Sequence, residues 1–179
     1  MVQKRRKLIL VLICAIAVVL TVLVINALVS YIETNSILEK GIKITSFTAE
    51  NKSEISSYFD ITANDTLEFV SLEYRENLKD ICTELQIKLV DKTKVSEILL
   101  NYSISEEVYS PLSFEGKFSE DYELSSEQYV NSKNSHMRAY TFSNGENIIL
   151  LILCDRETDY SLKEYVYNQV KVKNFEKLN

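Results

Sequence analysis

The residue types that carry most enzyme chemistry are scarce in this sequence. Histidine occurs once, at His136, beside the start of an expected strand. A single histidine excludes a multi-histidine zinc site, and the prepared turn of a serine nucleophile, GxSxG, does not occur. Glycine-rich phosphate loops and a CxxC pair are also missing. We therefore predict no catalytic residue, no cofactor and no metal ion, and we interpret His136 as a surface residue near a strand end.

Carboxylates gather between residues 106 and 127, where Lys117 is the only cation. A calcium site needs oxygen ligands at fixed short spacing and a turn glycine. The densest part, Asp121-Tyr122-Glu123, lacks that glycine and a third regular ligand, so we favour a solvated acidic face. Paired carboxylates would also suit a glycoside hydrolase, but no pair stands out among 26 acids. The acids of this stretch are Glu106, Glu107, Glu115, Glu120, Asp121, Glu123 and Glu127.

Aromatic rings share this acidic stretch. Tyrosine is favoured at recognition surfaces because it buries a large area at low entropic cost and keeps a polar tip. One hypothesis is therefore an interaction surface here for a protein partner. The alternative, which we favour, is that the rings cover the sheet of a domain that has no Trp. The rings concerned are Tyr109, Phe114, Phe118, Tyr122 and Tyr129.

Three cysteines occur in the chain. Cys14 falls in the apolar N-terminal run and behaves there as a small apolar residue. Cys82 and Cys154 would both lie on the oxidising side of a membrane, where two cysteines can pair. A disulfide between them is one hypothesis. Two buried thiols are the other, and the apolar run that ends at Cys154 favours burial.

The element that positions the rest of the chain is an apolar run from Leu8 to Val29, which carries no charged residue. About 20 helical residues, at about 1.5 Å each, cover the hydrocarbon core of a bilayer, which is about 30 Å thick. Only a helix satisfies its own backbone hydrogen bonds there. We predict a single transmembrane anchor over residues 8–30, preceded by a basic tail over residues 1–7.

Four cations at positions 4–7 precede the anchor, and the first acid after it is Glu33. By the positive-inside rule, this predicts a plasma-membrane protein with a cytoplasmic N-terminus and an extracytoplasmic C-terminal part. A cleaved signal peptide is the alternative. Its apolar core is usually only about 7–15 residues long and ends at a small-x-small site. The best such site here follows Ala27 and has the large Ile25 two residues before it.

Charge limits the partners of the outer part. The whole chain has 20 Lys and Arg against 26 Asp and Glu, a net charge of −6, and without the four N-terminal cations the remainder carries −10. Such a domain is repelled as a whole by nucleic acid and by anionic lipid, so we predict no nucleic-acid binding. With 3 Gly and 1 Pro, flexible linkers are not expected.

Hydrophobic periodicity predicts an α+β domain. We expect helices on one face of a mostly antiparallel sheet of about five or six strands. Two hairpins are expected. The first, from 66–75 and 81–90, has a wet face formed by Cys82, Glu84, Gln86 and Lys88; the second, from 136–142 and 146–154, closes with a type I′ turn at Asn144-Gly145. The remaining expected elements are helices after Thr48, over 93–102 and briefly around Tyr129, a strand over 111–118, and a terminal short helix and strand.

These predictions divide the chain into a cytoplasmic tail (1–7), an anchor (8–30), a juxtamembrane stalk (31–44) and an extracytoplasmic domain (45–179). Because no catalytic constellation accompanies the anchored domain, our leading hypothesis is a single-pass envelope protein whose outer domain binds a protein partner or a ligand without catalysis. The alternative is a structural or assembly subunit of a membrane-embedded envelope complex. A hydrolase that uses paired carboxylates is the third hypothesis.

Overall fold

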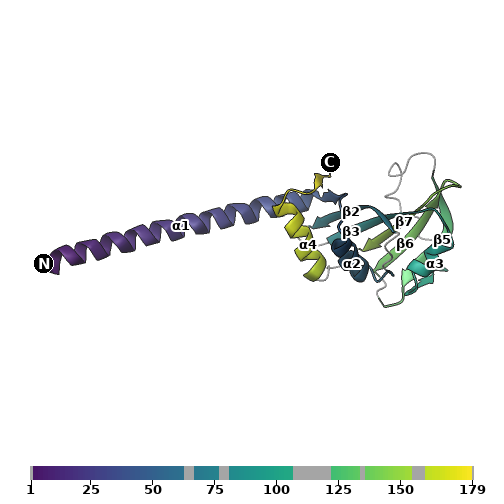
Figure 1. The fold of residues 1–179 in the computed structure, drawn as a ribbon, viewed down its shortest axis with the longest axis horizontal. Coiled ribbons are helices and arrows are strands. Elements are labelled where there is room, and N and C mark those ends of the chain that lie inside the picture. The colour runs from purple at the N-terminus through teal and green to yellow at the C-terminus, as the bar shows by residue number, and fades with distance from the viewer. Residues whose placement is uncertain are drawn as a thin grey trace. The chain divides into compact units, whose positions relative to one another are not determined.

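A computed structural model describes residues 2–62, 67–76, 81–106, 122–133, 136–154 and 160–178 (Figure 1). Three of the predicted interaction residues, Tyr109, Phe114 and Phe118, and the strand expected over 111–118 lie outside these residues. The chain divides into two compact units, Met1–Ile37 and Leu38–Asn179. The first is a single helix, and the second is an α+β domain, the predicted class.

Helix α1 (Val2–Lys40) contains the whole predicted anchor. From Leu10 to Ile32 its apolar side chains are exposed on every side of the helix, and none of this apolar part is buried in the structure described. A helix that is apolar all round belongs in a core or in a membrane. With a mean hydropathy of 3.0, it is long and apolar enough to cross a bilayer, a test that a signal sequence also passes.

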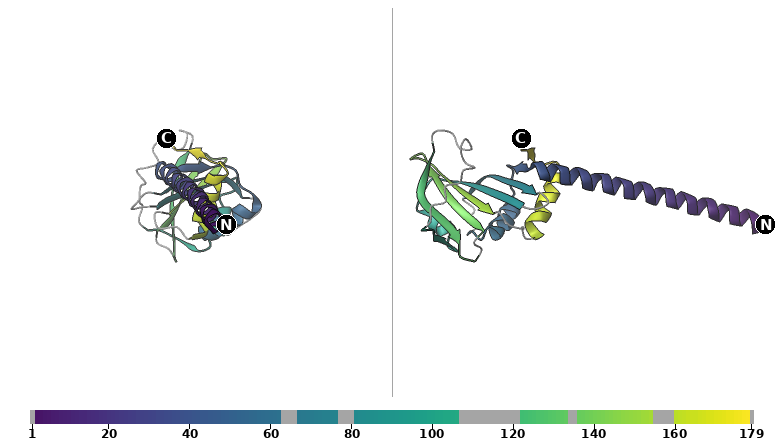
Figure 2. Two further views of the ribbon diagram at one scale, coloured as in Figure 1. Left: turned by 90° about the vertical axis from the view of Figure 1, so that its left-hand side faces the viewer. Right: turned by 180° about the vertical axis from the view of Figure 1, so that it is seen from behind.

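The domain is built on one eight-stranded sheet in which neighbouring strands pair antiparallel (Figures 1 and 2). The strand order is β4-β5-β6-β7-β3-β2-β1-β8. We expected fewer strands, because β4 and β8 are too short to leave a periodic pattern. The strands are β1 (Ile42–Ile44), β2 (Glu68–Glu76), β3 (Ile81–Leu89), β4 (Tyr102–Ile104), β5 (Glu123–Asn131), β6 (Met137–Ser143), β7 (Ile148–Cys154) and β8 (Glu176–Lys177).

Helices α2 (Ala49–Tyr58) and α4 (Tyr160–Lys171) pack together on one face of this sheet (Figure 1). The N-terminus of α2 is the predicted one. The Thr48 hydroxyl accepts from the Asn51 N–H at 3.2 Å, and the Asn51 side chain accepts from the Thr48 N–H at 3.3 Å, which forms a capping box. The sheet face beneath these helices is the core, with fully buried Leu85, Ile87, Leu150 and Ile152.

The first predicted hairpin is confirmed as β2 paired with β3. A bulge between Phe69 and Ser71 shifts the register, so Phe69, Leu72 and Tyr74 all face the helices. The prediction of a solvent-exposed face on this hairpin is wrong for its two central residues. Glu84 and Gln86 are 5% and 8% exposed, because the sheet extends beyond this hairpin and carries buried residues on both faces.

The second predicted hairpin is confirmed as β6 paired with β7. Strand β7 lies in the middle of the sheet with apolar residues on both faces. The type I′ turn is wrong, because four residues, Asn144 to Asn147, separate the strands and only Gly145 has a positive φ, 89°. The Asn144 side chain closes the loop by accepting from the N–H groups of Glu146 and Asn147.

Three of the remaining predicted elements differ from the structure. The residues around Tyr129 form strand β5 and not a helix, and a register shift between Leu124 and Gln128 interrupts the alternation that identifies a strand. Helix α3 (Lys94–Ile98) is shorter than expected, since β4 begins at Tyr102. Helix α4 continues to Lys171 and is longer than the short terminal helix that we expected, and the two-residue strand β8 follows it.

The domain begins at Leu38, inside the segment 31–44 that we expected to be a juxtamembrane stalk. Leu38, Ile42 and Ile44 are 0–1% exposed, so this segment is part of the domain core. Helix α1 ends at Lys40, and Gly41 follows it with a φ of 95°. Strand β1 then pairs with β2 on one side and with the C-terminal β8 on the other. The compact unit therefore starts at Leu38.

Candidate functional site

The sheet face opposite α2 and α4 carries a mixed apolar and polar surface, which we call the opposite face. In an antiparallel sheet, directly paired residues share a face, so the register identifies its members. Three rows run across β3, β7, β6 and β5. They are Lys88-Ile149-Phe142-Leu124, Gln86-Leu151-Tyr140-Gln128 and Glu84-Leu153-Arg138-Val130.

The centre of the opposite face is an apolar cluster of Tyr140, Phe142 and Leu151, which are 3%, 5% and 0% exposed. Partly buried side chains surround it, namely Tyr122, Ile149 and Leu153. Leu124, which pairs with Phe142, is 40% exposed. Aromatic and apolar side chains are enriched at the centre of protein interfaces, and the members of this cluster that stay accessible to a partner are those around its buried centre. We call Tyr122, Leu124, Ile149 and Leu153 the rim.

Polar groups are buried beside this cluster. Gln86 donates from Nε2 to Glu84 Oε1 at 2.9 Å. The hydroxyl of Ser71, which pairs with Gln86 and is fully buried, has no hydrogen-bond partner among the described residues. Lys43 forms an ion pair with Glu73 at 3.3 Å, and Glu73 lies opposite Glu84 in the register. Few polar groups beside a largely apolar surface give orientation to a ligand or partner that the apolar part holds.

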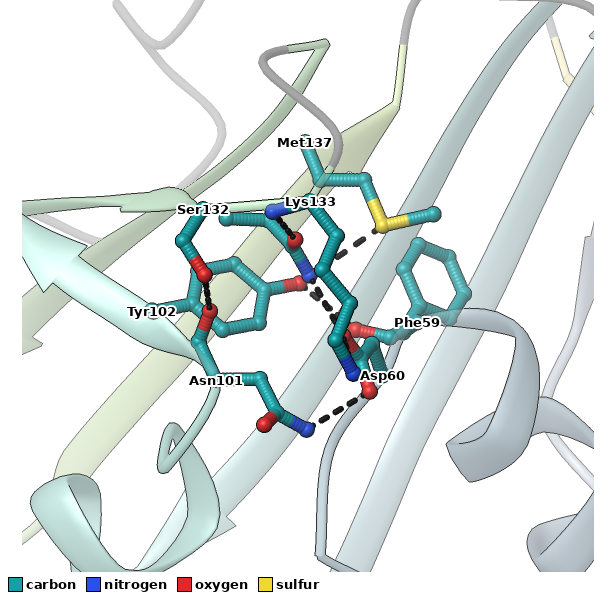
Figure 3. A network of polar contacts seen from close by, with 8 residues as sticks. Phe59, Asp60, Asn101, Tyr102, Ser132, Lys133 and Met137 are labelled. Carbon is teal, nitrogen blue, oxygen red and sulfur yellow. Dashed lines mark hydrogen bonds and ion pairs between the residues drawn. The ribbon is translucent and has the colours of Figure 1, made fainter.

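A second polar cluster, the Asp60 junction, lies at the C-terminus of α2 (Figure 3). The Asp60 carboxylate accepts from Asn101 Nδ2 at 2.6 Å and from Asn131 Nδ2 at 3.1 Å, and Lys133 Nζ lies 3.6 Å from it. These partners come from the turn before β4 and from the end of β5. Asp60 has a φ of 53°, in the left-handed region that Asp and Asn tolerate better than most residues. The junction thus ties together three segments that are distant in sequence.

Tyr102 completes the junction (Figure 3). Its hydroxyl donates to the Phe59 carbonyl at 2.6 Å and lies 3.7 Å from Met137 Sδ. Burial raises the pKa of this phenol well above its ordinary value, and the nearby Asp60 carboxylate raises it further. The carboxylate is occupied by two amides and an ammonium group. We interpret the junction as structural, since its carboxylate has no obvious access to a reacting proton.

The structure gives Cys82 and Cys154 as thiols that are not joined in a disulfide, which corrects that hypothesis. Cys154 pairs with Thr83 in the register, so the neighbouring Cys82 points to the other face of the sheet. Two cysteines on opposite faces cannot bring their Cβ atoms to disulfide distance. Cys154 is buried, as the second hypothesis held, but Cys82 is exposed.

The buried Cys154 thiol meets α2 beneath the helices. Tyr58 Oη lies 3.3 Å from Cys154 Sγ, and the Thr83 hydroxyl donates to the Cys154 carbonyl at 3.5 Å. Burial raises the pKa of Tyr58, and its contact with the thiol raises it further. Because Cys154 is buried and lies against this phenol, we interpret the pair as a packing contact.

The predicted aromatic surface is only partly described. Tyr122 packs against the apolar cluster as a member of the rim, which is compatible with the predicted surface. Tyr129 is 8% exposed and lies on the helix-covered face, because it pairs with Ala139 in the same row as Leu85. Its hydroxyl donates to Glu127 at 3.0 Å. Tyr129 thus matches the alternative, in which the rings cover the sheet.

The titratable residues that we considered for catalysis or metal binding do not converge in the part of the chain described. His136 is half-buried in the turn before β6. Of the acidic stretch, the side chains of Glu106, Glu123 and Glu127 are described, and the first two are exposed. Among the described residues, no three His, Cys, Asp or Glu side chains could hold a metal ion together.

The Asp60 junction and the buried Glu84–Gln86 pair were not predicted from the sequence. Asp60, Asn101 and Asn131 are far apart in the chain, and nothing in their local sequence marks them. The Glu84–Gln86 pair carries a signal only in hindsight, since two polar residues in an otherwise apolar strand indicate either a wet face or a buried pair. Comparison of the chain with known protein families, with curated proteins and with solved structures returned no match.

Proposed function

We propose that this protein is a single-pass, membrane-anchored binding module whose C-terminal domain works outside the cytoplasm without catalysis. The observation that carries the proposal is the pairing of α1, apolar on every side, with a separate compact domain from Leu38 onward. The four cations before the apolar run favour a cytoplasmic N-terminus in the plasma membrane. The length of the apolar run favours an uncleaved anchor over a signal peptide.

We place the binding surface on the opposite face, at the rim of Tyr122, Leu124, Ile149 and Leu153. A partner that covers these side chains would extend the apolar cluster of Tyr140, Phe142 and Leu151, much as a core extends across an interface. Lys88 and Arg138, which are partly exposed in the flanking positions of the rows, would orient that partner through charge. Tyr109, Phe114 and Phe118 remain candidates from the sequence alone.

Photo-crosslinking in intact cells tests this placement. In one variant, a photoreactive residue replaces Leu124 at the rim. In the control variant, it replaces Leu100, which is 71% exposed in the turn before β4. Capture of one dominant protein from position 124, and not from the more exposed position 100, would support the proposal. Capture at 124 should be lost when Leu153→Asp is added to the rim. Equal capture from both positions would contradict the proposed surface.

The same experiment separates the proposal from an assembly subunit of a membrane complex. Replacing residues 8–29 with an unrelated apolar helix keeps the chain in the membrane but removes any specific helix contacts. A binding module retains capture from position 124 after this exchange. Loss of capture would favour the subunit, which depends on its own helix.

A further inference from the structure

The edge of the domain formed by β1, β8 and the end of α4 is basic, unlike the rest of the outer chain. Four of its lysines are exposed, together with Val172, which is 69% exposed. Two exposed glutamates, Glu39 and Glu176, share this edge, so these side chains carry a net positive charge where the chain beyond the anchor carries −10. We call this set the basic edge: Lys40, Lys171, Val172, Lys173 and Lys177.

Backbone contacts hold these residues together. The C-terminal strand pairs with β1 through Glu176 opposite Lys43 and Lys177 opposite Ile42, and the Leu178 N–H donates to the Gly41 carbonyl at 3.0 Å. These bonds place Lys177 and Leu178 beside Ile42 and Gly41, the residues that directly follow Lys40.

The end of α4 presents the other lysines at the same edge. The N–H groups of Val172 and Lys173 donate to the carbonyls of Asn168 and Val170, both at 3.1 Å. Lys173 then takes a φ of 58°, which turns the chain toward β8. An exposed Val172 therefore stands between two exposed lysines on a defined turn and not on a loose tail.

The chain itself keeps this edge near the bilayer. The apolar run ends at Val29 and the domain begins at Leu38. Nine residues span at most about 30 Å even when fully extended, and only about half of that as a helix. The start of the domain, and with it the C-terminal strand that pairs with β1, therefore stays close to the end of the apolar run in any arrangement of the two units.

We propose that the basic edge contacts anionic phospholipid headgroups of the bilayer that α1 spans, with Val172 entering the interfacial layer. Lysines that flank an exposed apolar side chain suit this layer, because the ammonium groups meet phosphates while the apolar group leaves water. The domain as a whole is repelled by such a surface, so the basic edge would orient it with its acidic part away from the membrane. This inference rests on the proposed membrane anchoring.

The test uses the full chain in lipid nanodiscs. Cys14→Ala and Cys82→Ser leave only the buried Cys154, and Val172→Cys then carries an environment-sensitive probe. Val90→Cys, at a residue that is 81% exposed after β3, is the control position. We expect the probe at 172, but not at 90, to be several-fold less accessible to an aqueous quencher when phosphatidylglycerol is added to phosphatidylcholine discs.

A matched pair of charge variants completes the test. Lys171→Glu with Lys173→Glu should abolish the protection at position 172, whereas Lys92→Glu with Lys94→Glu, at two exposed lysines beside α3, should leave it unchanged. Equal accessibility of the probe at 172 and at 90 in both lipid mixtures overturns the inference. Protection at 172 that changes neither with phosphatidylglycerol nor with the Lys171 and Lys173 substitutions also overturns it. A chain that fails to enter nanodiscs overturns the anchoring itself, a separate and recognisable failure.

Discussion

Asp60 and its partners tie three segments of the domain together through single side chains. The carboxylate joins the end of α2 to the turn before β4 and to the end of β5 (Figure 3). Asn131 is 2% exposed, and besides donating to Asp60 it accepts from the Lys133 N–H at 2.8 Å. Removal of this amide would leave buried polar groups without a partner, which costs more than a surface hydrogen bond is worth.

We therefore expect Asn131→Ala to lower the free energy of unfolding by about 1–3 kcal/mol. Asn174→Ala is the control. Asn174 is exposed, and among the described residues its side chain bonds only to Gln169 nearby in sequence. The free energy of unfolding should therefore fall by no more than about 0.5 kcal/mol in this variant. Urea unfolding of the full chain in detergent, followed by tyrosine fluorescence, measures both. Similar losses in the two variants would show that the Asp60 junction does not stabilise the fold.

Two buried tyrosines give a contrasting pair. The Tyr102 hydroxyl donates to the Phe59 carbonyl, whereas the Tyr165 hydroxyl has no hydrogen-bond partner among the described residues. Tyr102→Phe should cost about 1–2 kcal/mol and Tyr165→Phe close to nothing. Urea unfolding of both variants at neutral pH checks this, and equal losses would contradict the assigned hydrogen bonding.

Tyrosine burial also predicts a loss of stability in alkali. Burial raises the pKa of Tyr165 from its ordinary 10.0 to about 12, and it raises the pKa of Tyr102 as well. Between pH 10 and 12 the unfolded chain ionises these phenols while the folded domain keeps them protonated. The stabilisation is thus complete below pH 10 and is lost as the pH rises toward 12. Tyr165→Phe should flatten this decline, and an unchanged decline would contradict it.

At the scale of elements, the sequence predicts what local periodicity and capping determine. The α+β class, the helix that begins after Thr48 and both hairpins follow from such local signals. The elements that failed have another cause. The register shift in β5 breaks the alternation on which strand assignment depends, and it made β5 resemble a helix.

The surfaces were harder to predict than the elements, because burial depends on partners distant in the chain. Glu84 and Gln86 alternate like a wet face, yet they lie in the middle of a wide sheet. The separation of Cys82 from Cys154 follows from the register of β3 with β7, which the sequence does not encode locally. The Asp60 junction has the same origin, since tertiary packing alone brings its members together.

Two glycines lie where one element of the domain connects to the next. Gly41, between α1 and β1, and Gly145, in the β6–β7 loop, both have a positive φ. A Cβ at Gly41 would lie 2.8 Å from Leu178 Cδ1 and 3.2 Å from Arg75 Nε, whereas a Cβ at Gly145 would meet nothing within 4 Å. Only Gly41 is therefore needed both for its conformation and for space.

Gly145→Ala should cost about 1–2 kcal/mol for the left-handed backbone alone. Gly41→Ala should cost about 1 kcal/mol more than that, because Leu178 must move and β8 loosens from β1. Hydrogen exchange of the full chain would show the second effect as reduced protection of the Leu178 N–H, which bonds to Gly41. Equal costs and unchanged exchange at Leu178 would contradict the crowding at Gly41.

The molecule as a whole consists of an apolar helix followed by an acidic domain, and the domain carries the basic edge. The two sheet surfaces have different roles in it. The helix-covered face provides the core, and the opposite face is the surface proposed for a partner. Both proposals depend on one claim about membrane topology. The domain must lie outside the cytoplasm while the helix stays in the membrane.

Cysteine labelling of the full chain in intact cells tests that claim most directly. Cys82 is exposed on the domain, whereas Cys154 is buried and Cys14 lies in the apolar helix. The account predicts that a membrane-impermeant maleimide labels the membrane-bound chain without permeabilisation, and that Cys82→Ser abolishes the labelling. Labelling that requires permeabilisation would place the domain in the cytoplasm, and release of the labelled domain from the membrane would show that the N-terminal helix is cleaved. Either result would contradict the account.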